Sequence, residues 1–158
     1  MEDDVIRQSF VEAHTQALSF LVQFGWQGPV ILAKGYLIRW THECIGLEVR
    51  LDWRDLAVSA YLCRLPEAEE PGTWAVDCSG RTVRLLLENF LTPQERLDEE
   101  LKRIASEFRE LKTKAIVYLY TAEGFAEACR KHAALIARIL GKYGDRIIQR
   151  ASEAFGCS

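Results

Sequence analysis

The side chains that most often carry chemistry are thinly spread along this chain. It has three histidines, and two of them, His14 and His132, fall within predicted helices. Neither has a second histidine or a carboxylate–histidine metal pair four residues away. His42 is followed by Glu43 and Cys44, but in a strand only His42 and Cys44 share a face. Because a zinc site needs further ligands, the sequence predicts no metal site.

Motifs for covalent catalysis and for nucleotide binding are also missing. The chain has no G-x-S-x-G motif, and Ser79 precedes Gly80 in a predicted turn. Its glycines form neither G-x-G-x-x-G nor the phosphate-binding P-loop pattern. Glu48 and Asp52 would share a strand face with Arg50 between them, which is the spacing of a carboxylate pair, but such residues are usually solvated on the wet side of a hairpin. We therefore expect no catalytic residue, no cofactor and no enzymatic activity.

The strongest local pattern lies in residues 47–63, LEVRLDWRDLAVSAYLC. Apolar and charged residues alternate from 47 to 52, and the alternation resumes at 56 after Trp53-Arg54-Asp55. Period-two alternation buries one face of a sheet and leaves the other in water. The pattern predicts two antiparallel strands joined by a short turn.

Further strands are predicted on both sides of this hairpin. Residues 30–33 form a short apolar run, and residues 36–41 alternate in part. The acidic stretch 66–72, bounded by prolines, is expected to be a loop. Residues 74–77 and 81–85 could form a last short hairpin, although a helix starting at Val83 competes with this interpretation.

Helices are predicted at both ends of the chain. Apolar residues at steps of three and four indicate a helix from about residue 3 to residue 24, ended by Gly25. Thr92-Pro93-x-Glu95 is typical of a capped helix start. A later helix at 122–140 is expected to break at Gly141 and Gly144 before a terminal helix. Residues 115–120 fit a helix by pattern and a strand by propensity.

The order of these elements predicts one α+β domain over residues 1–158. It would have an N-terminal helix, an antiparallel meander of about four strands, and two to three C-terminal helices packed on one face. With 49% hydrophobic residues and a formal net charge of −3, the composition is that of an ordinary globular domain.

Composition also bears on compartment and partners. No apolar run is long enough to cross a membrane, and the acidic start lacks the order of a signal peptide. Five cysteines at scattered spacings indicate no disulfide framework, so we expect a reducing, cytoplasmic location with Cys63 and Cys129 buried. Six basic residues near the C-terminus share no single helix face, which makes nucleic-acid binding a weak alternative; they are Arg130, Lys131, Arg138, Lys142, Arg146 and Arg150.

Two tryptophans mark the residues best suited to binding a partner. Trp53 occupies the predicted hairpin tip, and Trp74 follows the acidic loop. An aromatic anchor with a polar rim is typical of protein interfaces. The predicted partner-binding surface consists of Asp52, Trp53, Asp55, Glu67, Glu69, Glu70 and Trp74.

The order of motifs is similar to that of bacterial immunity proteins, which are found beside secreted polymorphic toxins, and of related small α+β proteins. The similar segments are Phe-Gly-Trp at 24–26, the strand pair at 47–65 and HAALIARILGKYGD at 132–145. This resemblance implies a stoichiometric inhibitor that binds and occludes a cognate toxin domain. Its charge is milder than in members that block nucleases, so it implies no nuclease partner. A homodimer is a further alternative for the oligomeric state.

One alternative belongs to a different class. A small enzyme or ligand-binding domain would have a pocket between the sheet and the helices. Its candidate lining residues are Tyr36, Trp40, Tyr61 and Tyr118.

Overall fold

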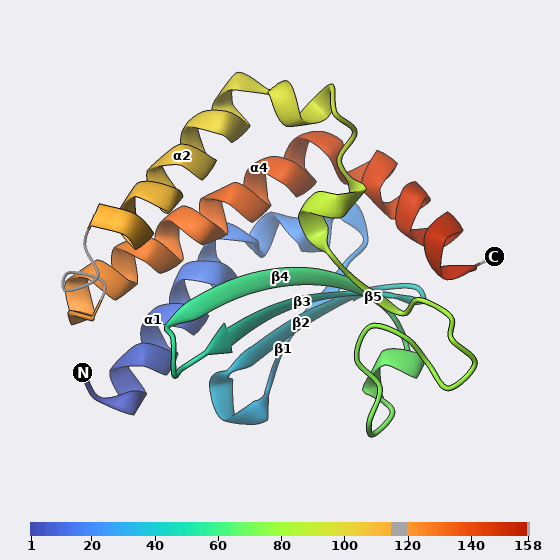
Figure 1. Cartoon of the computed structure of the whole chain (residues 1–158), viewed down its shortest axis with the longest axis horizontal. Helices are drawn as coiled ribbons and strands as arrows, with labels where there is room; N and C mark the ends of the chain where they lie inside the picture. Colours follow the sequence, from blue (N-terminus) through green and yellow to red (C-terminus); the bar gives the residue numbers. More distant parts are fainter. Residues whose placement is uncertain (115–119, 158) are drawn as a thin grey trace.

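The computed structural model describes residues 1–114 and 120–157 and confirms the α+β class. Helix α1 (Asp3–Ala17) and a 3-10 segment (Ser19–Phe24) precede a five-stranded sheet. The sheet is followed by helix α2 (Glu99–Lys114) and helix α4 (Ala122–Phe155). Figure 1 shows the helices gathered on one side of the sheet, with α2 lying on α4 rather than on the strands.

The sheet is an antiparallel meander in the order β1-β2-β3-β4-β5, with one strand more than expected. Its bounds are β1 (Gln27–Leu32), β2 (Leu37–His42), β3 (Ile45–Asp52), β4 (Ala57–Arg64) and β5 (Arg84–Leu86). β3 and β4 pair along their whole length, which confirms the predicted hairpin. The predicted hairpin at 74–85 is wrong in part. Val76 and Thr82 form only an isolated bridge, and β5 pairs with β4 instead.

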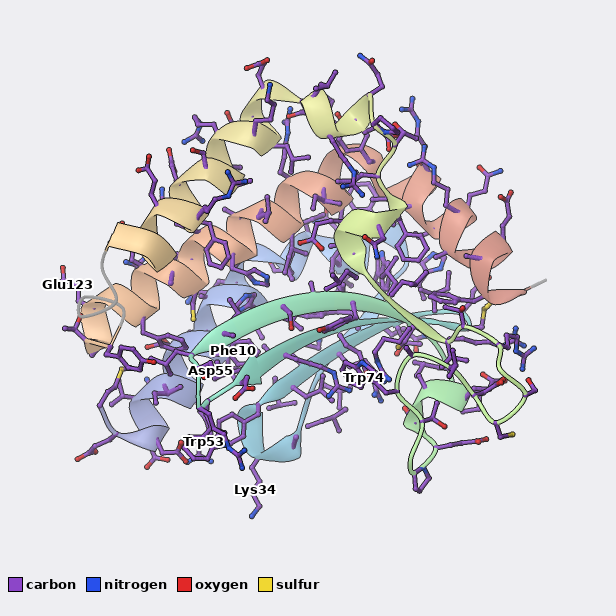
Figure 2. All side chains as sticks on the ribbon, in the orientation of Figure 1. Phe10, Lys34, Trp53, Asp55, Trp74 and Glu123 are labelled. Carbon is purple, nitrogen blue, oxygen red and sulfur yellow. A yellow bond between two sulfur atoms is a disulfide. The ribbon has the colours of Figure 1, made fainter. Side chains whose placement is uncertain are left out.

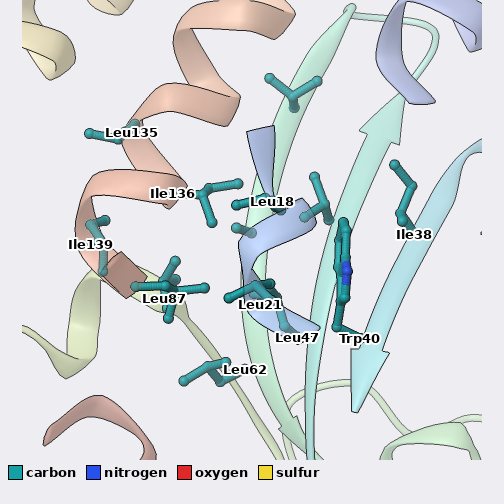
Figure 3. Packing of buried hydrophobic residues seen from close by; sticks show 14 of the residues in the cluster. Leu18, Leu21, Ile38, Trp40, Leu47, Leu62, Leu87, Leu135, Ile136 and Ile139 are labelled. Atoms are coloured by element: carbon teal, nitrogen blue, oxygen red, sulfur yellow. The ribbon is translucent and has the colours of Figure 1, made fainter. Parts of the chain in front are cut away.

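The core lies between the inner face of the sheet and the helices. Trp40, Leu47 and Leu62 project from three neighbouring strands and are fully buried. Figure 3 shows Leu18 and Leu21 lying between these strands and Ile136 of α4. Each fully buried side chain of this size contributes roughly 1.5–3 kcal/mol through removal of apolar surface from water. The apolar residues of the alternating strands and those of the helix stripes therefore pack into a single core.

Helix α4 continues through Gly141 and Gly144, so the predicted break there is wrong. It runs for 34 residues and is capped by Thr121, whose side chain accepts a hydrogen bond from the Gly124 N–H. Each glycine costs only about 1 kcal/mol inside a helix, which burial of the apolar face outweighs. A Cβ at Gly141 would lie 4.0 Å from the Phe20 ring, an ordinary van der Waals contact, so packing does not require a glycine there.

The predicted capping box forms, but it starts a 3-10 turn rather than α2. Thr92 and Glu95 exchange backbone-to-side-chain hydrogen bonds at 2.9 and 3.1 Å. The chain then turns at Asp98, whose carboxylate accepts a hydrogen bond of 2.8 Å from the Leu101 N–H and so caps α2. The start of helix α2 is displaced by six residues, because the cap is Asp98 and not Thr92.

Two carboxylates, Glu95 and Asp98, hold the basic residues of α4. Hydrogen bonds from Arg150 lower the pKa of Glu95 from its ordinary 4.5 to about 2, against the opposing effect of burial. Contrary to expectation, four of the six basic residues do share one helix face, because they recur every four residues. That face pairs with Glu95 and Asp98, and its members are Arg138, Lys142, Arg146 and Arg150.

A disulfide joins Cys44 to Cys157, which corrects the expectation of no disulfide. It ties the β2–β3 turn to the end of α4 across a sequence separation of 113 residues. Nothing in the local spacing of the cysteines could reveal this pair, because only the fold brings them together. Cys63 and Cys129 are buried and free, as expected.

A buried histidine pair connects α1 to α4. His14 Nδ1 lies 2.7 Å from the carbonyl oxygen of Phe10, which can only accept, so this nitrogen carries the proton. His14 Nε2 is then the acceptor for the N–H of His132 at 2.8 Å. Burial lowers the pKa of His14 from 6.5 to about 4, and the bond to Phe10 opposes this only in part. Both histidine rings therefore have hydrogen-bond partners within the fold.

This pair is expected to make folding sensitive to mild acid. Below pH 6.5 the unfolded chain takes up a proton at His14, whereas the native chain does so only near pH 4. Stability should therefore fall by roughly 1–3 kcal/mol between these values. Urea unfolding at a series of pH values measures the loss, and His14→Gln should flatten it. His42→Gln serves as the control and should keep it; an unchanged pH slope in His14→Gln would contradict this account.

The disulfide leads to a second expectation. In urea without reductant, iodoacetamide should label three cysteines, and all five after reduction. Closing so long a loop restricts the unfolded chain, so Cys157→Ser should lower the free energy of unfolding by about 2–4 kcal/mol. Cys78→Ser, at an exposed free thiol, should leave stability unchanged. Labelling of five cysteines before reduction would show that the pair does not form.

Candidate functional site

The structure divides the predicted partner-binding residues between two places. Asp52, Trp53 and Asp55 lie at the β3–β4 turn, whereas the segment 67–74 follows the opposite end of β4. Figure 2 shows Trp53 and Asp55 at one end of the hairpin and Trp74 on the outer side of the sheet. Eight residues of strand span about 26 Å. The predicted residues are therefore two surfaces and not one.

The turn is the simpler of the two surfaces. Trp53 is 54% exposed, and the Arg54 guanidinium carbon lies 5.7 Å from its ring centroid. Asp52 accepts a hydrogen bond from the Arg54 N–H at 3.0 Å, which fixes the turn. Asp55 is exposed. These residues are accessible to a partner, but only the Arg54 contact holds the Trp53 ring among the contacts described for this turn.

Trp74, in contrast, is held tightly while 47% of it stays exposed. The guanidinium carbons of Arg84 and Arg50 lie 4.4 and 4.8 Å from its ring centroid. The Tyr61 ring meets it edge-on, with centroids 5.3 Å apart. Contacts of an arginine with a tryptophan face contribute about 0.5–2 kcal/mol each. The indole is thus fixed over the outer face of the sheet.

Beneath Trp74 lies a fully buried carboxylate, that of Glu48. Arg84 donates to it at 2.8 Å, Arg39 at 2.6 Å and Arg50 at 3.1 Å. Burial alone would raise the pKa of Glu48, but the hydrogen bonds from Arg84 and Arg39 outweigh it and leave the pKa below its ordinary value. The expectation that Glu48 is merely solvated is wrong, because the segment 66–82 covers this face.

Arg84 connects the sheet to that covering segment. Besides Glu48, it donates to the backbone carbonyl oxygens of Trp74 at 2.6 Å and Ala68 at 3.1 Å. The three arginines against one buried glutamate leave this face with excess positive charge. Sequence reasoning did not identify these arginines, although alternation placed Glu48 and Arg50 on one face.

The acidic residues of the covering segment are only partly available to a partner. Glu69 pairs with Arg39, and Glu67 lies 3.3 Å from Arg64. Glu70 is exposed. The loop therefore contributes two exposed carboxylates, Glu69 and Glu70, of which Glu69 is already paired within the chain.

The alternative pocket has a counterpart, but other residues line it. A groove of about 1030 Å³ runs between β4, α2 and α4. Trp40 is buried in the core and Tyr61 lies on the outer face. Tyr36 lies away from this groove, where its hydroxyl donates a hydrogen bond to Asp3 of α1. Tyr118 lies outside the described residues.

The remaining observations concern metals and membranes. Within residues 1–114 and 120–157, no cluster of three or more histidine, cysteine, aspartate or glutamate side chains could hold a metal ion. None of the helices in the described part of the chain has both the length and the apolar composition needed to span a bilayer.

Comparisons of the chain with protein-family models, with characterised proteins and with solved structures found no match.

The Glu48 cluster leads to a stability expectation. Glu48→Gln removes the one negative charge that three arginines share, so it should cost about 3–5 kcal/mol of unfolding free energy. Urea unfolding at pH 7 measures this. Glu70→Gln, in the covering segment, is the matched control and should change stability by less than about 0.5 kcal/mol. Equal stability of the two variants would show that the buried carboxylate is not needed.

Proposed function

We propose that this chain is a non-enzymatic protein-binding module of the immunity type, which binds and neutralises a cognate bacterial toxin domain. The observation that carries the proposal is Trp74, exposed and yet fixed between two arginines on the outer face of the sheet. Tryptophan and arginine are the residues most enriched among interface hot spots.

Preorganisation is what makes this surface suitable for tight binding. An interface loses affinity when flexible side chains must be ordered on association. Here Glu48 already orders Arg50, and Arg50 and Arg84 already order Trp74. The entropy cost of ordering these side chains is therefore met in folding. A standard interface of roughly 800 Å² per partner could be centred on this cluster.

The charge of the surface supports a particular kind of partner. Arg39, Arg50 and Arg84 exceed the nearby carboxylates of Glu48 and Glu69 by one charge. Complementary charge raises the association rate and excludes wrong partners. We expect the toxin surface to present an acidic side chain to Arg50, which is the most exposed of the three arginines.

Protection from a toxin tests the proposal directly. On this proposal the toxin would be the variable C-terminal domain of a large secreted protein encoded beside this chain. That domain is to be expressed from an inducible promoter in a bacterial host. Co-expression of the intact chain should restore growth, and the two proteins should elute as a 1:1 complex. Failure to protect and to form a complex would reject the proposed function.

Two tryptophan variants locate the surface. Trp74→Ala should weaken the complex by about 2 kcal/mol, which is roughly 30-fold in Kd. The melting temperature of the free variant should fall by no more than a few degrees. Trp53→Ala is the matched control, because Trp53 is similarly exposed at the opposite end of the hairpin. If Trp53→Ala weakens binding and Trp74→Ala does not, the turn and not the outer face is the binding surface.

A further inference from the structure

Apolar side chains continue from Trp74 across the outer face of the sheet. The Tyr61 ring meets Trp74 edge-on, and Tyr61 is the direct partner of Leu86 in the β4–β5 ladder. Directly opposed residues of antiparallel strands project to the same face, so Leu86 lies beside Tyr61. Trp74, Tyr61 and Leu86 therefore form one continuous strip, which begins at the tryptophan that Figure 2 labels and ends on β5.

This strip lies at the border of the part of the outer face that the covering segment buries. Arg84 and Leu86 are two residues apart on β5 and share a face, yet Arg84 is 3% exposed and Leu86 is 41% exposed. A single exposed leucine is common in proteins. An exposed leucine that is continuous with two aromatic rings is instead typical of an interaction site.

Ser59 forms a low point next to the strip. It is opposite Arg50 in the β3–β4 ladder, and it precedes Tyr61 by two residues, so it shares the outer face with both. The β4–β5 ladder ends at the pair of Tyr61 and Leu86, which places Leu86 diagonally from Ser59. The serine side chain is much smaller than these three neighbours. We call the resulting depression the Ser59 hollow.

The two sides of the Ser59 hollow carry opposite charge. The Arg50 side chain is 31% exposed on the β3 side, while the Glu48 carboxylate that it contacts is fully buried. Glu88, half-buried in the 3-10 turn that follows β5, lies on the other side, where it lines the groove together with Ser59 and Leu86. A partner carboxylate is therefore favoured beside Arg50 and disfavoured beside Glu88, which orients the partner.

The dimensions of this surface fit a small group of partner side chains. Arg50 and Leu86 are separated by two strands across the sheet and by two residues along it. Strand geometry places their Cα atoms about 12 Å apart. One apolar side chain fits between them, with an acidic neighbour on the Arg50 side. Binding-energy hot spots are commonly side chains that fill such a depression on the partner.

We propose that an apolar side chain of the toxin domain enters the Ser59 hollow, packs against Tyr61 and Leu86, and is accompanied by a carboxylate beside Arg50. This inference rests on the proposed function and extends its surface beyond Trp74. A depression accepts only a side chain that fits it, so Ser59 and Leu86 select among toxin domains that Trp74 alone would bind equally.

Filling the hollow tests the proposal, with the toxin domain of the co-expression experiment as the probe. Ser59→Phe should weaken the complex at least ~30-fold in Kd, because the entering side chain is excluded. Ser59→Ala keeps the hollow and should stay within about threefold of the intact chain. Gln8→Phe, which adds the same ring at an exposed position of α1, is the control and should bind normally. The melting temperature of each free variant shows whether it is folded.

A second variant removes a wall of the hollow and does not depend on how Ser59→Phe folds. Leu86→Ser should weaken the complex about five- to tenfold, because apolar contact is lost. Val22→Ser is the matched control, since Val22 is 57% exposed in the 3-10 segment on the helix side, and it should have no effect.

Crosslinking identifies the chemistry of the occupant. Leu86 is replaced by its diazirine analogue, which is nearly the same size, and the complex is irradiated and digested for mass spectrometry. The crosslink should fall on an apolar residue of the toxin domain that has an aspartate or glutamate next to it. A crosslink to a surface without an acidic residue would overturn the assignment.

The outcomes separate this inference from the proposed function. If the intact chain neither protects the host nor forms a complex, the proposed function fails and this inference fails with it. If the intact chain does both while Ser59→Phe and Leu86→Ser bind as tightly as it does, only the Ser59 hollow is rejected.

Discussion

Neutralisation of one buried carboxylate organises the outer half of this molecule. A charged Glu48 cannot be buried without ion-pair partners. Its partners come from three strands: Arg39 from β2, Arg50 from β3 itself and Arg84 from β5. Arg84 in turn holds the covering segment through its backbone carbonyls. The Glu48 carboxylate lies on the outer face of the sheet, which the sequence predicted to be solvent-exposed. Through Arg84 it fixes the position of the segment 66–82 and the orientation of Trp74.

A second set of ion pairs determines what the helices leave open. Asp98 accepts hydrogen bonds from Arg138 and Tyr143 of α4 at 3.0 and 2.8 Å. It therefore fixes the start of α2 against α4 instead of against the sheet. Because α2 packs on α4, a groove remains between β4, α2 and α4. The same acidic residue that caps α2 therefore helps to form this groove.

Local patterns were sufficient to predict the architecture, but not the contacts between distant segments. Alternation at 47–63 and the apolar stripe of α1 depend on near neighbours, and both predicted the correct element. The predicted break at Gly141 was wrong because helix propensity alone leaves out the burial of the apolar helix face, which offsets the cost of a glycine. Glu48, Cys44 and the histidine pair could not be predicted, because their partners lie up to 118 residues away and only the fold brings them close. Of the predicted surface residues, Trp74 is held in place by Arg50 and Arg84, whereas Glu67 and Glu69 form ion pairs within the chain.

The outer face determines what a binding partner would have to supply. Trp74 and Arg50 are already ordered by contacts within the chain, so a partner adds apolar contact and charge complementarity to groups that are stable without it. Such a surface selects by shape and charge, because its side chains cannot rearrange to suit a different partner without losing the contacts that hold them. A toxin domain recognised there would have to match it side chain by side chain.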